Sequence, residues 1–217
     1  GESYLPAIEF ASALGEVLVR LARFEEAEHH YLQELDCARR VYGDRHAVTV
    51  SCIQNVGAFL LERARYDEAL PYFEEAVAAS RLTGITNYSC INNMGDALYF
   101  LNRHEEALPY IVEALEGRRA TLGDDHPHTI ISMNSLASLY QVLGKFEEAV
   151  PVWMETLKCA RISLGDDHYF TLATINNLGC LYRFMGMYEA AWPLMQEAVD
   201  RGRKSFGDDN RETTYYI

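Results

Sequence analysis

The segment Gly144-Lys145-Phe146-Glu147-Glu148-Ala149 decides the fold, because variants of it recur along the whole 217-residue chain. The intervals between copies are 42, 38, 42 and 42 residues, as shown by the closing alanine at Ala27, Ala69, Ala107, Ala149 and Ala191. A small marker residue lies 12 positions before each alanine, at Gly15, Gly57, Gly95, Ala137 and Gly179. The motif Leu-Gly-Asp-Asp-His stands at 122–126 and again at 164–168. Self-similarity in one register over five copies indicates a repeat protein.

Each copy predicts two helices, and the fourth copy shows the pattern most clearly. Apolar residues recur at helical spacing over 130–143. We expect Asp125 to cap this first helix, with Pro127 in its first turn, where a missing N–H costs little. Gly144 is expected to end the first helix in the manner of a glycine just past a helix C-terminus.

The second helix of the fourth copy is expected to open at Glu147 and Glu148, since acidic side chains suit the positive end of a helix dipole. Gly165 is expected to end it. No segment of the sequence shows the alternation of a strand bounded by turns. The predicted fold class is therefore all-α.

The copies predict one array over residues 1–217. Its repeats are placed at about 4–45, 46–87, 88–125, 126–167 and 168–209. Residues 210–217 match the start of another first helix, so we expect either a sixth copy of a longer array or a short cap. The short interval of 38 residues arises at the junction 82–87, which lacks one residue before Gly84 and three after it.

The composition is that of a globular protein with an acidic surface. Apolar residues make up 49% and charged residues 24% of the chain. The net charge of −13 disfavours binding to nucleic acid or to anionic membranes. No apolar run approaches the roughly 18 residues of a membrane span, and no basic n-region precedes an apolar stretch at the start, so we expect no signal peptide.

Five cysteines are an odd number, and none forms a C-x-x-C pair: Cys37, Cys52, Cys90, Cys159 and Cys180. This pattern supports neither a disulfide framework nor a zinc site. We predict reduced, partly buried thiols in a cytoplasmic protein.

No catalytic or metal site is predicted. Asp124, Asp125, His126 and His128 could be taken as metal ligands, but the Asp-x-His turn recurs between copies, which points to a structural turn. The sequence contains no G-x-S-x-G, G-x-x-x-x-G-K-[ST] or G-x-G-x-x-G motif. We therefore expect neither an enzyme nor a cofactor.

The spacing Leu178-Gly179-x-x-Tyr182, followed by Ala191, resembles the tetratricopeptide repeat (TPR). The period of 42 instead of about 34, the Asn-Asn-Leu-Gly of the first helix and the Tyr-Glu-x-Ala that opens the second resemble the kinesin-light-chain type of this repeat. The resemblance implies an α-solenoid, a right-handed superhelix of helix-turn-helix repeats with a concave groove. It implies a non-catalytic scaffold that binds a peptide segment of a partner in this groove.

Two alternatives to a peptide-binding scaffold stay open. The chain could be the sensor or regulatory array of a larger nucleotide-binding switch protein. It could also be a structural array that self-associates through its uncapped ends.

The resemblance places the groove positions on the first helix of each copy. The peptide-binding residues that it implies are Glu16, Asn55, Glu62, Asn92, Asn93, Asp96, Tyr99, Phe100, Asn134, Ser135, Asn176, Asn177 and Arg183. In kinesin light chains the second Asn of Asn-Asn-Leu contacts the cargo peptide, which implies this role for Asn55, Asn93 and Asn177, with Ser135 in the fourth copy. Side-chain amides offer donors and an acceptor to a peptide backbone. The alternative is that these amides cap helices or bridge to the next repeat.

Two other features of the implied groove predict the kind of partner. Tyr99 and Phe100 are candidate apolar anchors, since aromatic side chains dominate binding hot spots, although both could belong to the core between repeats. The acidic positions Glu9, Glu16, Glu62 and Asp96 outnumber the basic positions Arg20 and Arg183. By charge complementarity we expect a neutral or basic protein partner.

Overall fold

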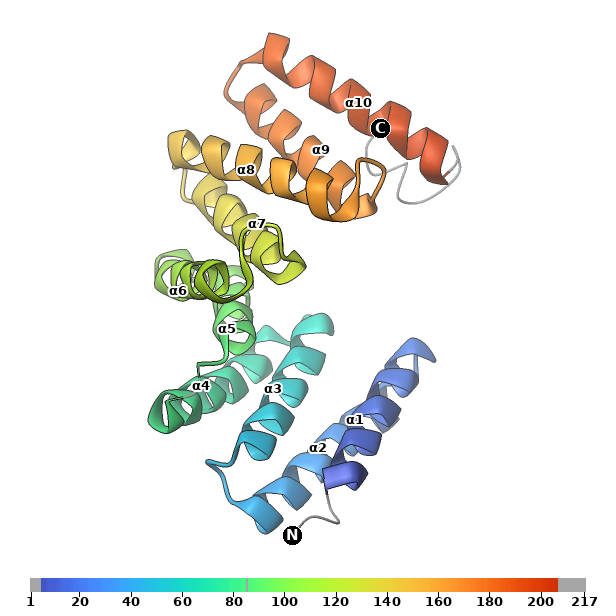
Figure 1. The fold of residues 1–217 in the computed structure, drawn as a ribbon, viewed down its shortest axis with the longest axis vertical. Coiled ribbons are helices and arrows are strands. Elements are labelled where there is room, and N and C mark those ends of the chain that lie inside the picture. The colour runs from blue at the N-terminus through green and yellow to red at the C-terminus, as the bar shows by residue number, and fades with distance from the viewer. Residues whose placement is uncertain (1–4, 85, 207–217) are drawn as a thin grey trace. The chain divides into compact units, whose positions relative to one another are not determined.

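The computed structural model describes the backbone of residues 5–84 and 86–206, and the side chains of residues 13–84 and 86–205. Within these ranges every regular element is a helix, so the all-α prediction is confirmed (Figure 1). The helices are α1 Leu5–Arg20, α2 Phe24–Tyr42, α3 Ala47–Glu62, α4 Tyr66–Thr83, α5 Tyr88–Phe100, α6 His104–Leu122, α7 Pro127–Val142, α8 Phe146–Leu164, α9 Tyr169–Phe184 and α10 Tyr188–Phe206.

The helices pack in order along the chain. Contacts join α1 with α2, α2 with α3, α3 with α4 and α4 with α5, and farther along α7 with α8, α8 with α9 and α9 with α10. The chain divides into two compact units, Gly1–Ala107 and Leu108–Ile217, called unit 1 and unit 2 below. Each unit therefore contains successive helix pairs of the repeat.

The short interval of 38 residues between Ala69 and Ala107 reflects shorter helices and not a shorter connection between them. Helix α4 has 18 residues against 19 in α2, and α5 has 13 against 16 in α3. Asn87 caps α5, because its side-chain oxygen accepts from the backbone N–H groups of Ser89 and Cys90 at 3.1 Å. Because this capping residue stands three positions later in the repeat than the caps of other first helices, α5 also starts later.

The predicted cap at Asp125 is wrong. His126 caps α7, where its Nδ1 accepts from the backbone N–H of His128 at 3.2 Å. His46 and His168 cap α3 and α9 in the same way. Pro127 occupies the first helical position, which makes the preceding histidine the capping residue.

The predicted helix ends are confirmed. Gly144 follows the end of α7 with φ +72°, and Gly165 follows α8 with φ +92°. Glycine adopts this left-handed region without the steric penalty of a Cβ. Glu147 and Glu148 lie in the first turn of α8, as expected.

The small marker residue allows the two helices of a pair to approach closely. A Cβ at Gly57 of α3 would lie 2.8 Å from the ring of Phe73 in α4, and one at Gly179 of α9 would lie 2.8 Å from Cγ of Met195 in α10. Both distances are too short for a methyl group. The small marker residue therefore faces, and makes room for, a bulky side chain on the second helix of the same repeat.

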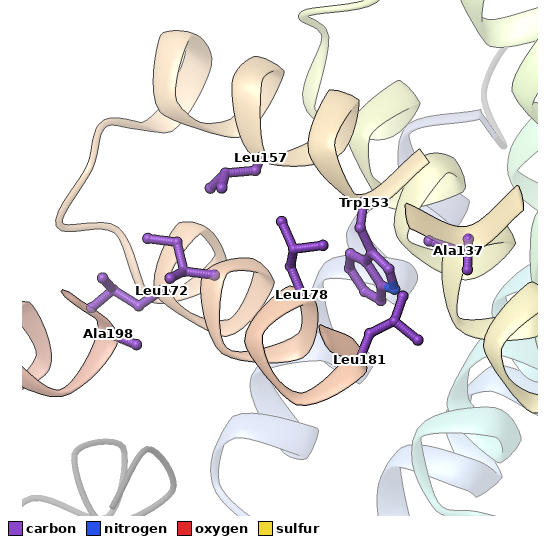
Figure 2. Close-up of a cluster of buried hydrophobic side chains, with 9 residues drawn as sticks. Ala137, Trp153, Leu157, Leu172, Leu178, Leu181 and Ala198 are labelled. Carbon is purple, nitrogen blue, oxygen red and sulfur yellow. The ribbon is translucent and has the colours of Figure 1, made fainter. Parts of the chain in front are cut away.

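Unit 2 shows the core in detail (Figure 2). The indole of Trp153 points from α8 toward Leu178 and Leu181 of α9, and it is 1% exposed. Ala137 of α7 belongs to the same cluster. Alanine replaces the marker glycine in this copy, and the largest side chain of the core accompanies it.

A row of ion pairs links the second helices of successive repeats. Arg39 binds Glu75 at 2.7 Å in unit 1, and in unit 2 Arg119 binds Glu155 at 2.5 Å and Arg161 binds Glu197 at 2.9 Å. The same arginines hold the first aspartate of the Gly-Asp-x-His turn, at Asp44, Asp124 and Asp166. The turn motif thus serves to tie each connection to the helix before it.

Candidate functional site

Unit 1 contains a cleft of about 520 Å³ between helices α1, α2 and α3. Its lining residues are Glu16, Val19 and Arg20 of α1, Tyr31 of α2, and Asn55, Ala58, Phe59 and Glu62 of α3. Glu16, Asn55 and Glu62 are predicted binding residues, and Arg20 is one of the predicted groove positions. The structure therefore brings groove positions from two successive first helices to one cavity.

The cleft has an aromatic floor. Tyr31 is 7% exposed and Phe59 is 4% exposed, with ring centroids 5.5 Å apart. Gly15 makes room for Tyr31, since a Cβ there would lie 2.6 Å from the tyrosine ring. The marker glycine of the first copy thus helps to shape this cavity.

The rim of the cleft is acidic. Glu16 and Glu62 are both exposed, and neither forms an ion pair with any side chain that the structure describes. Burial raises the pKa of Tyr31 to about 12, and the negative charges of Glu16, Glu62 and Glu34 add to this shift. The hydroxyl therefore stays protonated at neutral pH, facing negative potential.

The predicted aromatic residues of the third copy pack against the preceding repeat. The ring of Phe100 stacks on Tyr66 of α4, with centroids 4.7 Å apart and planes 11° apart, and stays half-exposed. Tyr99 lies edge-on to Phe100 at 5.3 Å. Burial, and then the charge of Asp96, raises the pKa of Tyr99. Phe100 thus keeps exposed surface while the aromatic group supports the packing between repeats.

The two positions of the Asn-Asn pairs differ in accessibility. The first asparagine is buried at Asn92, which is 1% exposed and donates to Asp96 at 2.7 Å, and at Asn176, which is 8% exposed. The second asparagine is half-buried, at Asn93 and Asn177. The second position is therefore the more accessible one in both copies.

In the second and fourth copies the two positions are equally half-buried. Gln54, which precedes Asn55, accepts from the side-chain amide of Asn87 at 2.5 Å and so bridges to the next first helix. Asn134 and Ser135 are both half-buried, and Arg183 is exposed. Gln54 and Asn92 thus show amides at the first position that bind side chains of this chain.

The described histidines and cysteines do not form a metal site. Among the described residues, no group of three or more His, Cys, Asp and Glu side chains could hold a metal ion. The rings of His126 and His128 stack with centroids 5.3 Å apart. All five cysteines are free thiols, and burial raises the pKa of Cys52 and Cys90 to about 12, so these thiols stay protonated. Over the helices that the structure describes, none has the length and apolarity of a membrane span.

Sequence reasoning missed the apolar half of the cleft. Tyr31 and Phe59 occupy positions that form core in the other copies, such as Phe73 and Leu139. The signal available was the pairing of a bulky residue with each marker glycine. That signal identifies a core position, and it does not tell which core side chain borders a cavity.

The family is evident from comparison with known proteins. The tetratricopeptide-repeat model matches residues 7–81, 87–152 and 129–204. No curated protein sequence matches the chain.

Three solved structures share the fold. A kinesin-light-chain protein of nearly identical TPR-like repeats from Podosopora anserina has a TM-score of 0.80 and 17% identity, over 94% of this chain and 99% of that one. BtubC from P. vanneervenii has a TM-score of 0.82 and 21% identity, over 94% and 83%. YrrB, a TPR protein with an unusual peptide-binding site, has a TM-score of 0.63 and 19% identity, over 99% and 97%. From its helix pairs and these matches, the chain belongs to the tetratricopeptide-repeat family.

Proposed function

We propose that this chain is a non-catalytic protein-interaction module that binds an extended or short helical segment of a partner protein. The binding surface is the exposed side of the first helices, and the cleft of unit 1 is its best-defined part. The observation that carries this proposal is the convergence of Glu16, Asn55 and Glu62 on one cavity of about 520 Å³. A cavity of this size, with an apolar floor and a few polar groups, has the features of a ligand site.

The second asparagine of each pair is proposed to hold the peptide backbone. Asn55, Asn93 and Asn177 are all half-buried, so their orientation is restrained while part of the amide stays accessible. An amide can donate to a carbonyl and accept from an N–H of the same peptide. YrrB, a protein of the same fold, has a peptide-binding site, which supports the proposal that this chain binds a peptide.

The partner segment is proposed to be neutral or basic. The acidic groups Glu16 and Glu62 have no ion-pair partner among the described side chains, so they attract positive charge. We also propose an adaptor role, as for the kinesin-light-chain-like neighbours, in the reducing cytoplasm, which suits five free thiols.

The proposal can be tested by selecting phage-displayed random peptides. The selected peptides are then synthesised, and their binding is measured by fluorescence anisotropy. We expect the selected peptides to bind wild type, and to bind the triple variant Asn55→Ala/Asn93→Ala/Asn177→Ala at least about tenfold more weakly. The matched control changes three exposed residues away from this surface, Gln33→Ala/Glu74→Ala/Lys158→Ala. Failure to select any peptide would reject the binding function, and equal affinity of both variants would reject the asparagine row.

A further inference from the structure

We propose that the cleft of unit 1 is a receptor for a single cationic side chain, a lysine or arginine of the partner segment. This inference rests on the proposed function and specifies its chemistry. The charged end of the ligand side chain lies between the carboxylates of Glu16 and Glu62. Its methylene stem passes over the floor formed by Tyr31 and Phe59.

The two carboxylates differ from the other glutamates of unit 1 by their place at the cleft. Five glutamates of unit 1 each lie 2.6–2.7 Å from an arginine nitrogen, namely Glu26, Glu28, Glu68, Glu75 and Glu106. Glu16 and Glu62 have no such partner among the described side chains, although Arg20 lines the same cleft. The arginines thus pair with many glutamates of the unit but with neither of the two that line the cleft.

The position of the two carboxylates is set by tertiary structure. Glu16 lies on α1 and Glu62 at the end of α3, and both border one cavity. Two negative groups that share a cavity repel each other, and a cation placed between them removes that repulsion. Burial is the main cause of the raised pKa of the Tyr31 hydroxyl, and the negative charges of Glu16 and Glu62 add to it.

The apolar lining selects a long side chain over a bare ion. Val19, Ala58 and Phe59 border the cleft beside the acidic groups. Lysine and arginine place their methylene stems along apolar surface while the charged end binds a polar group. A cation over an aromatic face gains further attraction, and unit 1 already contains such a contact, with the guanidinium carbon of Arg63 3.7 Å from the ring centroid of Phe24.

The test uses four capped tripeptides, acetyl-Gly-X-Gly-amide, in which X is lysine, arginine, glutamine or norleucine. Norleucine keeps the stem and removes the charge, and glutamine is polar and neutral. Binding to the full chain is followed by two-dimensional NMR at low salt, from the shifts of amide signals around the cleft. We expect the lysine and arginine peptides to bind about tenfold more tightly than the glutamine peptide. Raising the salt concentration should reduce this preference.

The decisive variant is Glu16→Gln/Glu62→Gln, which keeps the shape of the rim and removes its charge. It should bind the lysine and glutamine peptides with equal affinity. The matched control is Glu25→Gln/Glu74→Gln, which removes the same charge from two exposed glutamates of unit 1 outside the cleft. The control should keep its preference for lysine within about twofold of wild type.

Three results would overturn the inference. Equal binding of the lysine and glutamine peptides to wild type would exclude a cation receptor. If the control variant lost the preference for lysine to the same extent, the preference would depend on net charge alone. If the lysine peptide did not shift the amide signals around the cleft, the cation would bind elsewhere. In each case the selected peptides and the asparagine variant still decide the proposed function independently.

Discussion

Units 1 and 2 have the same helix-pair fold but differ in charge on their first helices. One residue after the marker, unit 1 has Glu16, Ala58 and Asp96, whereas unit 2 has Ser138 and Cys180. At the groove positions of unit 2 no acidic residue occurs in the sequence, and Arg183 adds a positive charge. The residue type at these positions can therefore vary between repeats, because their side chains are not needed for the packing of a helix pair.

The interiors of the two units are alike by contrast. Phe73 of unit 1 and Trp153 of unit 2 occupy the same position of the second helix and are both almost completely buried. The ion pairs Arg39–Glu75 and Arg161–Glu197 also correspond. The repeat therefore maintains the interior and the links between second helices, while the exposed face of the first helices varies.

The largest expected effect tests whether the interiors are equivalent. Phe73→Ala and Trp153→Ala should each lower the free energy of unfolding by about 3–5 kcal/mol, because each leaves a cavity in a core. Met154→Ala, at a residue that neighbours Trp153 in sequence and is 54% exposed, is the control and should change it by less than about 0.5 kcal/mol. Urea unfolding of the three variants measures these values. A loss of stability in only one of the two core variants would show that the interiors are not equivalent.

A smaller effect is expected where the marker glycine gains a methyl group. Gly57→Ala should cost about 1–3 kcal/mol, since its Cβ would lie 2.8 Å from the rigid, buried ring of Phe73. Gly179→Ala should cost less, because the unbranched side chain of Met195 can move aside. Thermal and urea unfolding compare the two variants. An equal or larger loss at Gly179 would show that the backbone, and not the facing side chain, sets the requirement.

The charge difference between the first helices of the two units can be reduced by adding an acidic residue to unit 2. Ser138→Glu places in unit 2 the acid that Glu16 supplies in unit 1. We expect it to tighten binding of a selected basic peptide about twofold, or ~0.4 kcal/mol, as measured by anisotropy at low salt. Thr121→Glu adds the same charge at an exposed residue off this face and should leave the affinity unchanged. Equal gains in both variants would mean that only net charge matters.

The smallest effect is expected for the ion pairs between second helices. Double-mutant cycles of Arg39→Met with Glu75→Gln, and of Arg161→Met with Glu197→Gln, should each give a coupling energy of about 0.2–1 kcal/mol. Both arginine side chains are 38% exposed, so solvent screens the two pairs alike. The coupling should fall as salt is raised. Coupling in only one unit would show that these links are not equivalent.

Most of the fold could be predicted because its signals are local. The 3.6-residue period, the glycines past helix ends and the acidic first turns all act within a few residues, and Gly144, Gly165, Glu147 and Glu148 were assigned correctly on that basis. The cap was misassigned by one residue, from His126 to Asp125, because the start of α7 depends on the backbone of Pro127. A single residue of error changes which side chain meets the first free N–H groups.

The candidate site depended on contacts that no local pattern contains. The repeat could identify Glu16, Asn55 and Glu62 as exposed positions of first helices, but which of them share a cavity is set by the packing of one helix pair on the next. The same packing brings Arg39 to Glu75 across 36 positions of sequence and makes Tyr31 the floor of a cleft. Periodicity specifies which side of a helix is buried, because it depends on backbone geometry alone. The neighbours of an exposed side chain are decided by packing between helices, which only the tertiary structure contains.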